Sequence, residues 1–332
     1  MAILMAVTVL TLCSAVTASG QEASSWRDPS PHQVKFVTVE DGVQLEVLDW
    51  GGAGRPIVLL AGYLTAHAYD DFAPHLTRIG HIYGITRRGF GASSRPASGY
   101  TSQRLSEDIV RVLDTLKLSK PILIGHSFGG QDQTILAENH PERIAALVYL
   151  NSAEDPTVTD YGVRPPDGKR LPAIKRDPPD FSSFQAYRAS EMRIHGVAFP
   201  EAEVRQQYAA NPDGTVGKYL VSSQVREAMF KGLEKPDFTR IKVPVLAFFA
   251  APISLEDEIL KYQPRNEDQR SAVEQQYRFE MAVRDRHVQD LKKGVPSARI
   301  VELSNANFYI FLSNEGDLLR ELQSFINALH SY

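Results

Sequence analysis

The chain has 332 residues, with 36 lysines and arginines against 40 aspartates and glutamates, and a formal net charge of −4 at pH 7. Hydrophobic residues make up 43% of it, which is an ordinary globular composition and excludes a disordered chain or a collagen-like fibre. The length allows two domains, or one large α/β domain with an insertion. No block of like charges offers the basic patch that nucleic-acid binding needs, so we expect no nucleic-acid partner.

The first 20 residues predict a secretory signal peptide. They carry no charge, have an apolar middle, and end in small residues at Val16-Thr17-Ala18 or Ala18-Ser19-Gly20. The basic start of most signal peptides is missing, which leaves a membrane anchor, a misassigned start or a disordered leader as alternatives. Cys13 is the only cysteine, so no disulfide can form within the chain. We expect a secreted or periplasmic protein without a stable membrane span after cleavage.

Strand patterns begin after a polar linker at residues 21–33. Residues 34–39 and 43–50 alternate apolar and polar side chains around Asp41-Gly42, which is typical of a tight β-hairpin. Later apolar runs are nearly continuous, as in parallel strands buried on both faces. These runs are 56–60, 81–86, 121–124, 144–150, 243–250 and 298–303.

Helical patterns separate these runs. Residues 101–118 place their leucines, isoleucine and valine on one face, and residues 131–139 are compatible with a helix. The last helix is predicted to begin at Asn314, a good N-cap. Strands that alternate with helices predict a doubly wound, mostly parallel α/β sheet.

Residues 151–240 interrupt the alternation. Six prolines fall between residues 156 and 179, and short helical patterns follow at 181–195, 201–209 and 223–233. Their aromatic residues offer apolar surface to bury, which favours a cap or lid inserted after the sixth strand over a disordered loop. The predicted core is therefore formed by residues 34–150 and 241–332.

Gly125-His126-Ser127-Phe128-Gly129 follows a predicted strand and precedes a predicted helix. This G-x-S-x-G pattern in a strand-turn-helix context predicts a nucleophile elbow with Ser127 as the nucleophile. Gly125 and Gly129 allow the strand and helix to pass closely. The backbone N–H of Phe128, at the start of the helix, can stabilise an oxyanion.

With this motif the chain resembles the α/β-hydrolase superfamily, in particular its serine esterases and lipases, from about residue 34 onward. The resemblance places an oxyanion loop at Leu59-Leu60-Ala61-Gly62-Tyr63, with the N–H of Tyr63 as second donor. Thr86-Arg87-Arg88-Gly89-Phe90-Gly91 is similar to a loop in which the family usually has an acidic residue where Thr86 stands. Epoxide hydrolases of the same fold carry aspartate at the nucleophile position, so Ser127 implies acyl transfer from a small substrate to water.

The catalytic base is missing from its expected place. By resemblance the histidine should follow the last strand at Phe308, and phenylalanine cannot accept a proton. Loss of the histidine alone removes about six decades of turnover in a serine protease. His67 and, less readily, His126 are the possible substitutes, whereas His287 and His330 are expected on the solvated surface.

The acid also has several candidates. Related sequences with an Ala-x-Pro-x-Ser-x-x-Asp run place an aspartate at Asp257, which we prefer over Glu256. Glu154, after the sixth strand, is the alternative.

Two hypotheses remain. The chain is a serine-dependent hydrolase of small esters, with a substitute base or impaired turnover, or it is a catalytically dead pseudo-hydrolase that binds a ligand or partner. No metal-ligand spacing and no nucleotide motif are found, so we expect neither a metal nor a cofactor.

Overall fold

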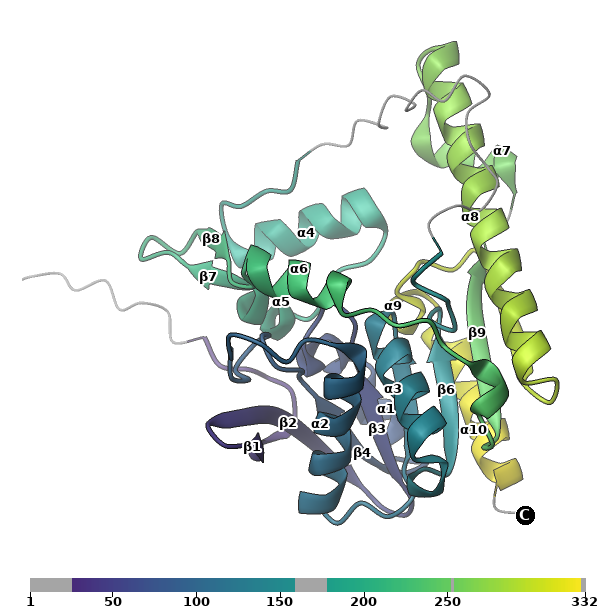
Figure 1. Ribbon diagram of the computed structural model, residues 1–332. Coiled ribbons are helices and arrows are strands. Elements are labelled where there is room, and N and C mark those ends of the chain that lie inside the picture. Colours follow the sequence, from purple (N-terminus) through teal and green to yellow (C-terminus); the bar gives the residue numbers. More distant parts are fainter. Residues whose placement is uncertain (1–25, 159–177, 252–253, 330–332) are drawn as a thin grey trace, which may run out of the picture.

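The computed structural model describes residues 26–158, 178–251 and 254–329. Its centre is an eight-stranded sheet in the order β1-β2-β4-β3-β5-β6-β9-β10 (Figure 1). β1 and β2 form the predicted antiparallel hairpin, β2 pairs antiparallel with β4, and the strands from β4 to β10 pair in parallel. The strand bounds are β1 Gln33–Glu40, β2 Val43–Gly52, β3 Pro56–Leu60, β4 His81–Ile85, β5 Ile122–His126, β6 Ala146–Leu150, β9 Val245–Ala251 and β10 Arg299–Ser304. The prediction of a doubly wound, mostly parallel sheet is confirmed.

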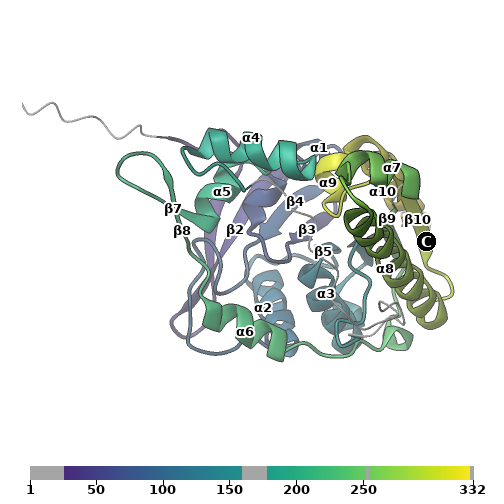
Figure 2. The same cartoon turned by 90° about the horizontal axis from the view of Figure 1, so that it is seen from above.

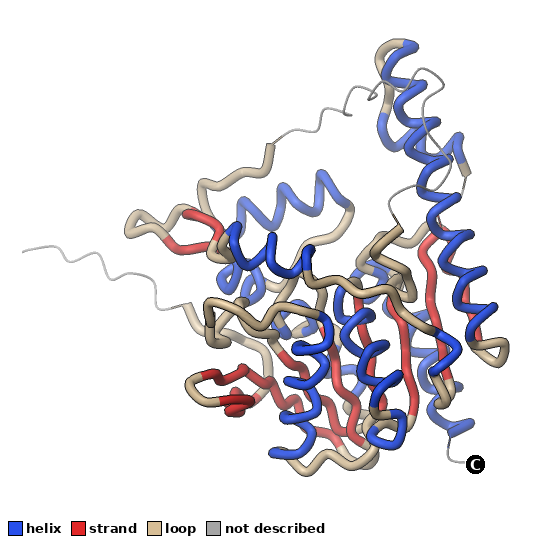
Figure 3. Tube along the Cα trace, viewed as in Figure 1, coloured by secondary structure: helices blue, strands red, loops and turns tan. Residues whose placement is uncertain are grey.

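Helices cover both faces of this sheet, which forms the middle layer of the molecule (Figure 3). Alternate strand residues face opposite layers: Val58 and Leu60 pack into one core and Ile57 and Leu59 into the other. The first core includes α2 (Ser102–Thr115), α3 (Phe128–Asn139) and the end of α8 (Glu267–Gly294). The second includes α1 (Ala73–Leu76), α9 (Ile310–Ser313) and α10 (Glu315–Leu329). Short 3₁₀ turns are η1 Ala66–Tyr69, η2 Pro141–Arg143 and η3 Phe238–Arg240.

Residues 178–231, between β6 and β9, lie over the carboxyl ends of the strands (Figure 1). They contain α4 (Phe184–His195), α5 (Glu201–Gln207), a small ribbon of β7 (Tyr208–Ala210) and β8 (Val216–Tyr219), and α6 (Ser223–Lys231). Seen from above, α4 and α6 lie on opposite sides of the sheet (Figure 2). The apolar residues of this region form their own small cores, such as Phe184, Tyr187, Val204 and Val216. The helices α4, α5 and α6 match the three helical segments predicted for the cap.

A helical hairpin after β9 was not predicted. α7 (Leu255–Tyr262) and the long α8 rise beyond the sheet (Figure 1). α8 is 28 residues long and its buried positions are few: Ala272, Val273, His287, Val288 and Leu291. Because most of this helix is polar and exposed, it has no continuous apolar stripe that periodicity could detect.

Candidate active site

Ser127 occupies a strained turn between β5 and α3. Its backbone has φ 52° and ψ −127°, a conformation that residues with a side chain rarely adopt. A Cβ on Gly125 would lie 2.6 Å from the carbonyl oxygen of Gly129, and one on Gly129 would lie 2.2 Å from that of Leu60. The two glycines thus let strand, turn and helix pass closely, as the nucleophile elbow requires.

The loop after β3 lies directly against Ser127. A Cβ on Gly62 would lie only 2.8 Å from Ser127 Oγ, so the backbone at Gly62 borders the serine hydroxyl. Phe128 is the first residue of α3, and the backbone N–H at that position has no acceptor within its own helix. The two predicted oxyanion donors, the N–H groups of Tyr63 and Phe128, thus belong to the residues that follow Gly62 and Ser127 in the chain.

A buried ion pair between Arg87 and Asp132 supports the loop after β3. Arg87 Nη2 donates a hydrogen bond of 2.5 Å to the carbonyl oxygen of Ala61 and lies 2.9 Å from Asp132 Oδ2 on α3. Burial raises the pKa of Asp132 to about 6, although Arg87 opposes that shift. Thr86, where the family usually has an acid, donates to Glu46 Oε2 at 2.8 Å and accepts from the N–H of Ala66 at 3.0 Å. Asp132 could not be predicted as a partner of Arg87 because only the fold brings the two residues together.

Aromatic rings line the space beside the elbow. The Tyr63 ring lies 4.9 Å from that of Phe128 and 5.7 Å from that of Phe230 on α6. Phe230 is 59% exposed, so the cap presents an apolar surface to solvent next to these rings.

The residue at the expected base position contacts the elbow but carries no proton acceptor. The Phe308 ring lies 4.8 Å from the ring of His126, the neighbour of Ser127. His126 Nε2 donates to the carbonyl oxygen of Phe308 at 3.2 Å, and burial lowers the pKa of His126 to about 4. Within the described residues, no imidazole is hydrogen-bonded to Ser127 Oγ.

His67, the first candidate substitute, faces carboxylates. Its Nδ1 lies 2.9 Å from Asp70 and 3.2 Å from Asp28, and its Nε2 lies 3.4 Å from Glu46. Burial alone would lower its pKa, but these hydrogen bonds raise the pKa of His67 to about 12. A histidine held protonated in this way is no base for Ser127. His330 lies outside the described residues.

The prediction that His287 lies on the solvated surface is wrong. Its side chain is buried on the inner side of α8, with Nδ1 4.0 Å from Glu154 Oε2. Burial lowers the pKa of His287 to about 4 and raises that of Glu154 to about 7. The structure thus brings together two residues that the sequence analysis treated separately.

Asp257 lies in the first turn of α7. Its carboxylate accepts from Ser254 Oγ at 2.7 Å, and its own N–H donates back to that oxygen at 3.1 Å. This is helix capping, and Glu256 stands in the same exposed turn. Neither carboxylate is hydrogen-bonded to Phe308 or to a histidine in the part of the chain that the structure describes.

The fold agrees with what known proteins show. A family model described as alpha/beta hydrolase fold matches residues 55–206. The chain has the α/β-hydrolase fold. The crystal structure of E-2-(acetamidomethylene)succinate hydrolase superposes on this hydrolase fold with a TM-score of 0.65 and 18% identity, covering 89% of this chain and 99% of the other.

Curated relatives match the core of the hydrolase fold. The putative carbamate hydrolase RutD of Caulobacter segnis is 36% identical over 125 residues, which is 36% of this chain and 46% of the relative. Epoxide hydrolase 4 of Mus musculus is 30% identical over 148 residues, 42% of this chain and 40% of the relative. The chain thus matches less than half the length of these two relatives. Among the described residues, no helix is long and apolar enough to cross a membrane.

Proposed function

We propose that this protein is a serine-dependent hydrolase of small esters or related acyl compounds, with turnover impaired by the missing histidine. The observation that carries the proposal is the backbone of Ser127, held at φ 52° and ψ −127° with Gly62 packed on its hydroxyl. Strain of this kind costs about 1–3 kcal/mol and is typical of functional positions. Relatives named as hydrolases support the reaction class, and the apolar first 20 residues support a proposed secreted or periplasmic location.

Serine favours ester-type chemistry over epoxide opening despite the similarity to epoxide hydrolase 4. A serine hydroxyl attacks the ester carbonyl, the bond to the alcohol breaks, and the alcohol leaves with the serine's proton. Water then hydrolyses the acyl-enzyme to the carboxylic acid and restores the serine. The oxyanion donors at Tyr63 and Phe128 suit the tetrahedral intermediate of that route.

The second candidate is a pseudo-hydrolase that binds a ligand without turning it over. The observation that favours it is Phe308, whose ring occupies the predicted base position against His126. Without a base, the rate of hydrolysis would exceed the uncatalysed rate in water by only about 10³–10⁴-fold, through the oxyanion hole and substrate binding alone.

The test is hydrolysis of p-nitrophenyl acetate by the purified protein beside Ser127→Ala, Phe308→His and His287→Gln. Impaired hydrolysis predicts slow turnover that Ser127→Ala abolishes and that Phe308→His raises. Removing the histidine of a serine protease lowers kcat by about 2 × 10⁶-fold, and removing its acid lowers kcat by about 3 × 10⁴-fold. A restored histidine without an acid partner should therefore raise kcat by about 10²-fold.

The remaining outcomes separate the alternatives. If His287→Gln removes the turnover as completely as Ser127→Ala, the Glu154–His287 pair supplies the base. If the parent and Ser127→Ala are equally inert while Phe308→His is active, the chain is a pseudo-hydrolase. Activity that survives Ser127→Ala would refute a serine mechanism.

A further inference from the structure

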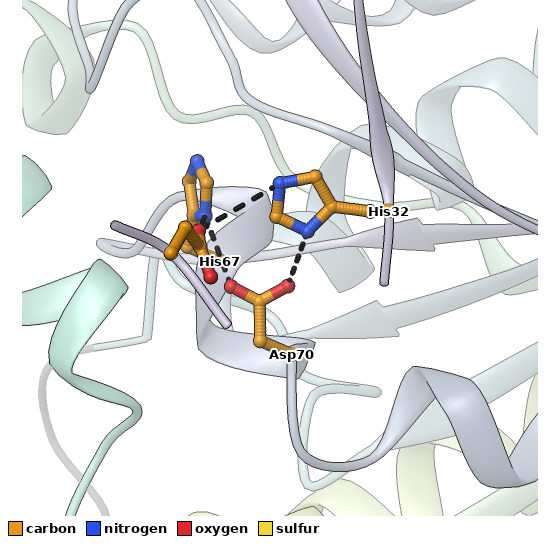
Figure 4. A group of neighbouring side chains, drawn as sticks. His32, His67 and Asp70 are labelled. Carbon is orange, nitrogen blue, oxygen red and sulfur yellow. Dashed lines mark hydrogen bonds and ion pairs between the residues drawn. The ribbon is translucent and has the colours of Figure 1, made fainter. Parts of the chain in front are cut away.

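Four potential metal ligands from two separate parts of the chain meet beside the oxyanion loop. Asp28 and His32 come from the segment before β1, and His67 and Asp70 come from η1 and the residue after it. One ligand atom from each of the four lies within 4.8 Å of all the others. Figure 4 shows the Asp70 carboxylate between the rings of His32 and His67. No metal site was predicted from the sequence because these four residues do not form a recognised ligand spacing.

The distances within the cluster suit a tetrahedral ion. His67 Nδ1 lies 2.9 Å from Asp70 Oδ2 and 3.2 Å from Asp28 Oδ2, and His32 Nε2 lies 3.7 Å from Asp28 Oδ2. Zinc bonds to nitrogen and oxygen are about 2.0–2.2 Å long, so ligand atoms of a tetrahedral site lie about 3.3 Å apart. The three distances bracket that value, and small shifts of side chains would admit an ion.

The other ring nitrogens of both histidines also face carboxylates. His32 Nδ1 lies 2.8 Å from Asp70 Oδ1, and His67 Nε2 lies 3.4 Å from Glu46 Oε1. Metal-binding histidines usually donate their second N–H to such a group, which fixes the tautomer and the ring orientation. Thr86 in turn donates to Glu46 at 2.8 Å, so this outer carboxylate is itself held in place.

Buried charge favours a cation. The side chains of Asp70 and Glu46 are each 3% exposed and that of Asp28 is 23% exposed. In the described part of the chain, no lysine or arginine forms an ion pair with any of these three carboxylates. The positive charge of His67 offsets one of these three carboxylates, and a divalent ion bound in place of its proton would offset two.

We propose that Asp28, His32, His67 and Asp70 bind one zinc-class divalent cation. Two imidazoles and two carboxylates suit Zn²⁺, and Co²⁺ or Ni²⁺ as substitutes, better than Mg²⁺ or Ca²⁺, which prefer oxygen ligands alone. Two carboxylates and two neutral imidazoles leave the occupied site electrically neutral.

The ion would fasten the segment before β1 to η1. η1 begins three residues after Tyr63, so the bound ion would also fix the end of the predicted oxyanion loop. No step of ester hydrolysis passes through this site, and its test does not depend on the proposed function.

The experiment measures Zn²⁺ binding to the purified full chain after dialysis against a chelator. Isothermal titration with ZnCl₂, followed by gel filtration and elemental analysis, should give one Zn²⁺ per chain. Co²⁺ in its place should produce the strong visible absorption of a tetrahedral complex. Saturation should also raise the melting temperature.

Two variants test the ligands and a third serves as the matched control. Asp28→Asn and His32→Gln should each weaken Zn²⁺ binding at least about tenfold, since even outer-shell changes cost 10–100-fold. His81→Gln removes another histidine that pairs with an aspartate, at 2.8 Å from Asp49, and should leave binding unchanged. Circular dichroism confirms that each variant is folded.

Three results would overturn the proposal. The first is the absence of stoichiometric Zn²⁺, Co²⁺ or Ni²⁺ in the folded parent, which would make the cluster a set of ion pairs. The second is an equal loss in His81→Gln, or none in Asp28→Asn and His32→Gln. The third is binding of Mg²⁺ or Ca²⁺ in preference to Zn²⁺.

Discussion

Replacing Gly62 with alanine would place a methyl group 2.5 Å from Ser127 Cβ and 2.8 Å from Ser127 Oγ. Carbon atoms in contact lie about 3.5–4.0 Å apart, so the loop or the serine must move by about 1 Å. Overpacking of this kind costs about 1–3 kcal/mol of unfolding free energy, and a shift of 1 Å at a reacting group costs about 10²-fold in rate. We expect Gly62→Ala to lose both stability and ester turnover.

A double-mutant cycle in urea isolates the contact, whether or not the protein is an active enzyme. Ser127→Gly removes both atoms that the new methyl group would strike, so Gly62→Ala should cost at least about 1 kcal/mol less in that background. Gly316→Ala is the matched control because a Cβ there meets nothing within 4 Å. Two results would refute the close approach of the loop to Ser127. Gly62→Ala could lower the free energy of unfolding equally with and without Ser127→Gly, or it could lower it no more than Gly316→Ala does.

Two further predictions concern buried polar groups near the elbow. Arg87→Met leaves the Asp132 carboxylate buried without its partner and should cost about 3–5 kcal/mol in urea unfolding. Arg87→Met with Asp132→Leu should recover most of that loss, and an equally unstable double variant would contradict the role of the pair. His126 has a folded pKa of about 4, below its ordinary 6.5, so the unfolded chain binds the proton first as the pH falls. The contribution of His126 to the free energy of unfolding is therefore complete above about pH 6.5 and decreases by about 3 kcal/mol toward pH 4. His126→Gln should reduce the loss of stability across that range by this amount, while the part due to His287, whose folded pKa is also about 4, remains.

Local patterns predicted most of the core. The apolar run at 56–60 became β3 with the same bounds, and the G-x-S-x-G turn has the backbone of an elbow, because both depend on neighbouring residues. The predicted helix 101–118 ends at Thr115, where a turn with positive φ at Lys117 replaces it. The end of a helix depends on its capping residues, so its exact position is harder to predict from periodicity than the existence of the helix.

The rest depends on contacts between distant segments. His287 looked exposed because its neighbours in the sequence are charged, yet α8 turns that one residue toward Glu154. Asp28 and Asp70 are 42 positions apart, and only the packing of the segment before β1 on η1 makes them neighbours. Periodicity and motif spacing carry no information about such pairs.

Glu203 on α5 ties the cap to the loop after β3. It is fully buried and accepts hydrogen bonds from the N–H of Thr65 at 3.1 Å and from Gln207 Nε2 at 2.6 Å. Lifting α5 would break the bond to Thr65 and would also separate Arg205 from the Trp26 ring, 4.8 Å away. α6 is held as well, because Val225 and Met229 pack on Phe90 and Tyr100, and the carbonyl oxygen of Gly232 accepts a hydrogen bond of 3.0 Å from the N–H of Ser102. Both helices are thus fastened to loops of the hydrolase core, so no bound ligand is needed to hold them in place.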